Sequence, residues 1–146
     1  MQKNTAWPAD MQTGIIPLDD LHRELFEMMA STASATDEEF AGNYSALLKK
    51  MKCALLKEEQ WMEEIDATLL KMYREQHARV LSTLDNIHRK VLEKDFDLGR
   101  KVVGDLLPQW YAAHVSTLDM ALAIAIQVNN IEVTMPIEQT SEIYVD

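Results

Sequence analysis

The sequence predicts an all-α protein, an up-down-up-down antiparallel four-helix bundle. Of the 146 residues only four are glycine and four are proline, so helix-favouring residues dominate. Apolar residues recur at three- and four-residue spacing in four long segments, as on the buried faces of amphipathic helices. Short polar turns join these segments, and short turns bring consecutive helices together in a bundle.

The first half of the chain contains an arm and two helices. Pro8, Gly14 and Pro17 predict an extended N-terminal arm over residues 1–17. The bundle domain, residues 18–127, then begins with a helix over residues 18–33. A turn at residues 34–37 precedes the second helix, which we expect over residues 38–65.

The second half contains two more helices and a tail. We expect the third helix over residues 69–93 and the fourth over residues 98–127. Pro108 lies inside the fourth helix, where it removes a backbone hydrogen bond and presses against the carbonyl of Gly104, so we predict a kink. The C-terminal tail, residues 128–146, is expected to pack on the outside of the bundle.

The charge, the cysteine count and the apolar stretches of the chain exclude several kinds of partner and compartment. The formal net charge of −10 disfavours nucleic acid and anionic lipid as partners. A single cysteine, Cys53, excludes an internal disulfide and indicates a reducing compartment. The N-terminal segment lacks the apolar stretch of a signal peptide, and the apolar stretch at residues 120–126 is too short to span a bilayer. We therefore expect a cytoplasmic protein without nucleic acid or membrane as a partner.

Each predicted helix places one side chain of a metal-ligand type on its inner face: His22, Glu58, His77 and His114. An ionisable group in an apolar core must be paired, hydrogen-bonded or metal-bound. Each one alone is more simply a hydrogen-bonded core residue or, for Glu58, a solvent-facing neighbour of Lys57. Four such groups at comparable depth favour a shared site, and imidazoles with carboxylates suit iron, zinc or manganese.

Asp119 is a fifth candidate, but its spacing from His114 is unusual. On an ideal helix five residues turn the chain by about 500°, which leaves Asp119 roughly 140° away from His114. The two can face one metal only where the helix is widened, so we predict a π turn between them. In a regular α-helix Asp119 would lie in solvent.

These residues, in this order, resemble the hemerythrin family, specifically the bacterial hemerythrins. The resemblance extends from about Trp7 to Ala123. Its landmarks are Trp7, Gly14-Ile15, Leu18-Asp19-Asp20-Leu21-His22, Leu25-Phe26, Glu58-Glu59, Met62, His77, Trp110-Tyr111-Ala112-Ala113-His114 and Asp119. A tryptophan followed by histidine four residues later, and by aspartate five further on, is a fairly specific spacing.

The resemblance implies two irons bridged by a pair of carboxylates, which map onto Glu58 and Asp119. One iron takes three imidazoles, expected at positions 73, 77 and 114. The other takes two, expected at positions 22 and 54, and keeps an open position where dioxygen binds. This chain has Tyr73 and Ala54 at two of these positions, so each metal has lost one imidazole.

The two metals are affected unequally. His77 and His114, with both carboxylates, remain for the first metal, whereas only His22 and the bridges remain for the second. We therefore expect one iron, or two bound unequally. Tyr73, one turn before His77, is a possible ligand, and a phenolate would favour ferric ion. Cys53 lies about 100° from Ala54 around the helix and is not an expected substitute.

We therefore expect a hemerythrin-like non-heme iron protein, monomer or homodimer, that binds or senses oxygen, nitric oxide or peroxide, or holds iron. Zinc and manganese are alternative metals, and bulk oxygen transport is disfavoured. Two other classes stay open. The first is a metal-free interaction or signalling module that contacts a protein partner through its acidic surface and tail. The second is a di-iron oxidase or peroxidase, although the sequence carries no substrate-pocket, phosphate-loop or nucleotide motif.

Overall fold

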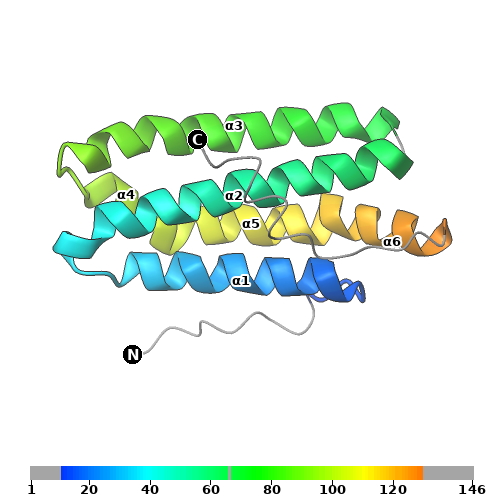
Figure 1. Cartoon of the computed structure of the whole chain (residues 1–146), viewed down its shortest axis with the longest axis horizontal. Coiled ribbons are helices and arrows are strands. Elements are labelled where there is room, and N and C mark those ends of the chain that lie inside the picture. The colour runs from blue at the N-terminus through cyan, green and yellow to red at the C-terminus, as the bar shows by residue number, and fades with distance from the viewer. Residues whose placement is uncertain (1–10, 66, 130–146) are drawn as a thin grey trace.

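The computed structural model describes residues 11–65 and 67–129, and within these ranges the fold is an all-α bundle without strands. Its elements are α1 (Ile16–Ala33), α2 (Asp37–Ile65), α3 (Ala67–Leu92), α4 (Asp97–Lys101), η2 (Val102–Leu106), α5 (Leu107–His114), η3 (Val115–Asp119) and α6 (Met120–Val128). The last five follow one another without a break and form a single composite fourth helix. Figure 1 shows the four rods side by side, joined by short connections at their ends. The predicted all-α bundle is confirmed.

The first helix begins earlier than predicted. α1 starts at Ile16, so Pro17 lies in the first helical turn and not in the arm. Proline fits there because the first N–H groups of a helix have no partner within the helix. The buried Asp19 carboxylate then accepts hydrogen bonds from the Thr13 amide at 2.7 Å, the Thr13 hydroxyl at 2.8 Å and the Gly14 amide at 3.1 Å. These bonds attach the described end of the arm to α1; residues 1–10 and 130–146 lie outside the described residues.

The fourth helix contains two π-helical segments, one predicted and one not. Pro108 predicts a kink, and at this place the structure has the π segment η2 directly before α5. The carbonyl that the Pro108 ring would press against belongs to Gly104, which lies within η2. The wider turn is therefore located where a regular helix would collide with the proline ring.

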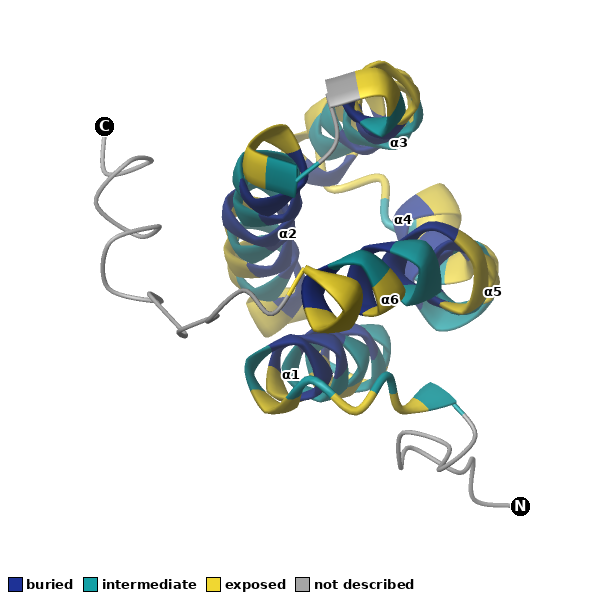
Figure 2. Ribbon diagram, turned by 90° about the vertical axis from the view of Figure 1, so that its right-hand side faces the viewer, coloured by how far each residue is buried: buried dark blue, intermediate teal, exposed yellow. Residues whose placement is uncertain are grey.

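The core consists of two apolar clusters with a polar layer between them. The larger cluster includes Leu25, Met51 and Tyr111, and the smaller one includes Met62 and Leu122. Figure 2 shows the buried faces of the rods turned toward one another. Along each rod one or two polar side chains lie between residues of the two clusters: His22, Glu58, His77, His114 and Asp119. The fold thus places all the predicted site residues at one level of the bundle.

The composite fourth helix is long and apolar enough, by length and composition alone, to cross a membrane. The core helix of a helical bundle meets the same criterion. Here Val103, Tyr111 and Leu122 from this helix are buried in the bundle core. Packing within the bundle therefore accounts for the buried part of this apolar surface, while Leu106, Ile124 and Val128 of the same helix are exposed.

Candidate metal centre

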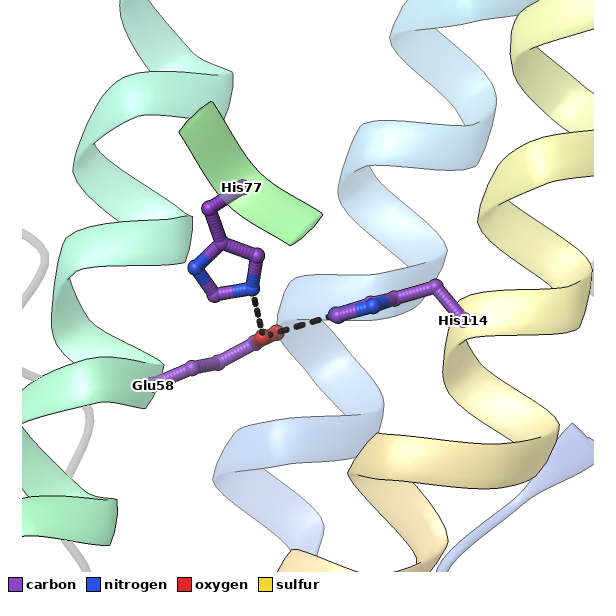
Figure 3. A group of neighbouring side chains, drawn as sticks. All are labelled: Glu58, His77 and His114. Atoms are coloured by element: carbon purple, nitrogen blue, oxygen red, sulfur yellow. Dashed lines mark hydrogen bonds and ion pairs between the residues drawn. The ribbon is translucent and has the colours of Figure 1, made fainter. Parts of the chain in front are cut away.

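Five side chains from all four rods converge in the polar layer, and each is at most 2% exposed. They form two overlapping groups, in each of which the candidate ligand atoms lie within 4.8 Å of one another. The first group is Glu58, His77 and His114, and the second is His22, Glu58 and Asp119. Figure 3 shows the His77 and His114 rings pointing at the Glu58 carboxylate from two different helices.

Glu58 is the residue that the two groups share. Its Oε1 lies 3.0 Å from His114 Nε2 and 3.5 Å from His77 Nε2. Its Oε2 lies 3.8 Å from His22 Nε2. The alternative of a solvent-facing Glu58 beside Lys57 is wrong, because Glu58 is completely buried.

Asp119 reaches the same point because the helix widens. The predicted π turn between His114 and Asp119 is confirmed as η3, and Asp119 is completely buried. Asp119 Oδ2 lies 2.8 Å from His22 Nε2, and Oδ1 lies 3.2 Å from His114 Nε2. The Asp119 carboxylate therefore lies between an imidazole of one group and an imidazole of the other.

Outer partners orient two of the imidazoles. His77 Nδ1 lies 2.7 Å from the Glu59 carboxylate, which Arg74 approaches from outside at 3.6 Å. His114 Nδ1 lies 3.3 Å from the Gln76 side-chain oxygen. Metal-binding histidines commonly donate their second N–H to such an oxygen, which leaves Nε2 for the metal. Sequence reasoning did not assign a role to Glu59 or Gln76, although each is a direct neighbour of a candidate ligand.

Tyr73 and Ala54 occupy the two positions where the family resemblance implies histidine. Both are buried, Tyr73 at 0% and Ala54 at 2% exposure. The Tyr73 hydroxyl donates a hydrogen bond to the Leu118 carbonyl and lies 3.4 Å from Asp119 Oδ1. The substitution at Ala54 leaves a methyl group where an imidazole would extend.

Two further residues of a metal-ligand type, His88 and Cys53, lie outside the cluster. His88 is half-buried, with Nε2 2.8 Å from the Ser45 hydroxyl and its ring stacked on Tyr44. Cys53 is buried, and its burial raises the pKa of the thiol. Neither belongs to the groups of candidate ligands.

Aromatic rings cover the imidazoles. The Trp110 ring stacks on His114 with centroids 4.9 Å apart and an interplanar angle of 11°. The Tyr111 ring meets His22 edge-on at 5.7 Å. These rings limit the rotation of the imidazoles and reduce their contact with water, which strengthens electrostatic interactions within the cluster.

The Glu58 and Asp119 carboxylates favour the protonated, positively charged forms of the histidines beside them. Burial lowers the pKa of His22, but the hydrogen bond to Asp119 and the nearby Glu58 carboxylate outweigh burial and raise the pKa to about 9. For His114, burial also lowers the pKa, and the Asp119 and Glu58 carboxylates raise it to about 10. Burial raises the pKa of Glu58, whereas its contacts with His114, His22 and His77 bring it well below the ordinary value. The arrangement stabilises cations at its centre, whether protons or a metal ion.

The donor set fits a transition metal. His77 Nε2 and Glu58 Oε2 are buried atoms for which the described residues provide no hydrogen-bond partner. Unpartnered buried polar atoms are costly and call for a specific explanation, such as an ion. Imidazole nitrogens with carboxylate oxygens are the ligands that iron, zinc and manganese accept. The residues present therefore fit the metal that the resemblance implies.

A comparison with curated proteins agrees with the resemblance. The chain is similar to the bacteriohemerythrin of Ralstonia nicotianae, with 27% identity over 113 residues that cover 77% of this chain and 82% of the relative. No family profile matches the chain. No solved structure gives a significant match. The fold, the cluster and this relative therefore all point to the same resemblance, that of the chain to the bacterial hemerythrins.

Proposed function

We propose that the chain binds one iron ion tightly through Glu58, His77, His114 and Asp119, and binds a second ion weakly or not at all. The observation that carries this proposal is the convergence of buried imidazoles and carboxylates around Glu58. The bundle would have the up-down-up-down connectivity of the sequence prediction, which the short connections between the rods support. We also propose that the protein is located in the cytoplasm, as expected from its sequence.

The two metal positions differ in the number of imidazoles and of outer partners that the protein provides. His77 and His114 each have an outer oxygen partner, from Glu59 and Gln76, that orients the ring. The second group has a single imidazole, from His22, and shares both of its carboxylates with the first. Because it has fewer protein ligands, the second position should bind a metal more weakly than the first. The same difference between the two positions should hold for zinc and manganese.

The proposed role is to bind or sense oxygen, nitric oxide or peroxide, or to hold iron. Bound iron would supply a coordination position for such a small ligand. The side chains would hold the ion, orient the imidazoles through Glu59 and Gln76, and exclude bulk water with the aromatic rings. Bulk oxygen transport is disfavoured because the position that carries oxygen in the family has only His22 left as an imidazole.

Metal content measured by elemental analysis tests the proposal. After reconstitution with iron and removal of excess, we expect about one ion per chain, as one set of four protein ligands would hold. His77→Ala should lose most of this metal, whereas His88→Ala, which removes a histidine outside the cluster, should retain it. A wild-type protein with less than about a tenth of an equivalent would overturn the proposal, since a formed site binds its metal tightly.

A metal-free interaction or signalling module is the second candidate, and one observation favours it. Hydrogen bonds already join the cluster, at 2.8 Å between His22 and Asp119 and 3.0 Å between His114 and Glu58. A protonated network of this kind stabilises a core without a metal. If iron and zinc both fail to bind while the protein stays folded, this candidate replaces the first.

A further inference from the structure

We infer that Tyr73 is a positioning residue: its hydroxyl holds the π segment η3 in the geometry that turns Asp119 into the metal centre. The inference rests on the proposed function, in which Asp119 is a ligand. It assigns a role to a position where the family resemblance implies an imidazole ligand. Four observations support it.

The first two observations concern the hydroxyl group. It donates a hydrogen bond to the carbonyl of Leu118, the fourth residue of η3, and it lies 3.4 Å from the Asp119 carboxylate. A π turn departs from the regular hydrogen-bond ladder of an α-helix. The Tyr73 hydroxyl, a donor from α3, supplies a contact from another helix to one of the carbonyls of η3.

The other two observations are the contacts of the ring and the burial of the whole side chain. It meets His77 edge-on with centroids 5.4 Å apart and meets His114 edge-on at 6.0 Å. Tyr73 is completely buried, so it has no access to solvent that would compete for the hydroxyl. One side chain therefore touches both imidazoles of the first group and the segment that carries Asp119.

A tyrosine ligand would need its oxygen directed at the metal as a phenolate. Here the hydroxyl proton is used in the bond to Leu118, on the backbone of the neighbouring rod. The coordination position that an imidazole at residue 73 would take is then left to water or to a small external ligand. At the position where the resemblance implies a histidine ligand, this chain thus has a tyrosine that positions another ligand, Asp119.

Tyr73→Phe removes the hydroxyl and keeps the ring, and Tyr44→Phe is its matched control. Tyr44 is also buried, and its hydroxyl also donates to a backbone carbonyl of another helix, Leu84, at 2.8 Å, in the larger apolar cluster. Both variants lose one interhelical hydrogen bond of the same kind. Only the loss at Tyr73 should affect the metal centre.

The first measurement is amide hydrogen exchange of the metal-free protein. We expect faster exchange within η3 in Tyr73→Phe, by about tenfold for one lost hydrogen bond, and no such change in Tyr44→Phe. The second is titration with Co²⁺, where we expect about tenfold weaker binding for Tyr73→Phe and unchanged binding for Tyr44→Phe. Equal exchange in η3 and equal Co²⁺ affinity in wild type and Tyr73→Phe would overturn the inference.

The third measurement is the visible spectrum of the ferric protein. A phenolate-to-iron charge-transfer band that disappears in Tyr73→Phe would make Tyr73 a ligand and would also overturn the inference. If wild type binds no metal, the proposed function fails. The hydrogen-exchange comparison needs no metal, so it then decides by itself whether Tyr73 holds η3.

Discussion

Both ring nitrogens of His77 face a carboxylate, from neighbouring residues of α2. Nε2 lies 3.5 Å from Glu58, on the side of the metal centre, and Nδ1 lies 2.7 Å from Glu59, on the outer side. The Glu59 bond selects the tautomer that presents Nε2 to a metal and fixes the plane of the ring. Glu59 is therefore the outer residue on which the first metal position depends most.

Removal of this outer carboxylate should weaken metal binding. We expect Glu59→Ala to raise the Kd for Co²⁺ by about 10- to 100-fold, the usual effect of losing an outer-shell partner. Glu64→Ala, which removes an exposed carboxylate of the same helix, should leave the Kd unchanged. Titration of the metal-free proteins measures both. Equal Kd values for Glu59→Ala and wild type would show that packing alone orients His77.

The raised pKa values of the histidines predict how the stability of the metal-free protein depends on pH. In the unfolded chain an imidazole has a pKa of about 6.5. In the folded, metal-free protein the carboxylates raise the pKa of His22 to about 9 and of His114 to about 10. The folded state thus binds more protons, so this stabilisation is complete below pH 6.5 and is lost as the pH rises through the folded values.

Thermal unfolding of the metal-free protein should therefore give a lower midpoint at pH 9.5 than at pH 6.5, since the unfolded chain gives up its imidazole protons in this interval while the folded state retains them up to the raised pKa values. A His22→Gln, His114→Gln double variant should show a weaker dependence on pH. His88→Gln, which changes a histidine outside the cluster, should keep the wild-type dependence. The same slope in all three proteins would assign the effect to other groups.

At the scale of elements, the start of α1 depends on Asp19. Its carboxylate accepts three hydrogen bonds from Thr13 and Gly14 and is 8% exposed. We expect Asp19→Ala to lower the free energy of unfolding by about 1–2 kcal/mol, as the loss of hydrogen bonds to a buried carboxylate does. Asp20→Ala removes an exposed neighbour paired with Arg23 on the surface, and such pairs contribute little. Urea denaturation should separate the two variants, and equal losses would contradict this role of Asp19.

The two π segments show what a sequence does and does not reveal about an element. η3 could be predicted because His114 and Asp119, five residues apart, need a widened turn to share a site. η2 was not predicted, because Val102 to Leu106 include no pair of groups that must meet. It lies where the Pro108 ring would collide with the helix backbone, a collision from which only a bend of the helix was predicted.

The same contrast holds for the candidate site. Helical periodicity placed His22, Glu58 and His77 on inner faces because a buried ionisable group interrupts an apolar stripe. The outer partners could not be predicted in this way. Glu59 and Gln76 lie on the flanks of their helices, where polar residues are ordinary, and only the packing of α2, α3 and α5 brings them to a ring nitrogen.

At the scale of the whole molecule, the cluster couples metal binding to folding. All four rods contribute a candidate ligand, so the unfolded chain has no comparable site. At a free metal concentration of about a thousand times Kd, binding should stabilise the native state by about 4 kcal/mol. Removal of the metal with a chelator should lower the thermal midpoint of wild type and of His88→Ala. It should leave the midpoint of His77→Ala nearly unchanged, and an equal drop in all three would place the metal elsewhere.

The position of Ala54 offers a test by gain of metal. Ala54 is buried one turn before Glu58 on α2, and the family resemblance implies an imidazole there for the second metal. We expect Ala54→His to raise the iron content above that of wild type, because His22 would then have a second imidazole beside the shared carboxylates. In the metal-free state the added volume should destabilise the bundle by about 1–3 kcal/mol.

Ala54→Gln is the matched control, because it adds a side chain of similar size without an imidazole. It should show the same loss of stability in the metal-free state and no gain in iron. Stabilisation by iron should therefore be larger in Ala54→His than in either wild type or Ala54→Gln, since a second bound ion adds its own binding free energy to folding. If Ala54→His holds no more iron than Ala54→Gln, then His22, Glu58 and Asp119 do not form the remains of a second metal position. Their contacts at 2.8 and 3.8 Å would then belong to a hydrogen-bonded core that accompanies a single metal.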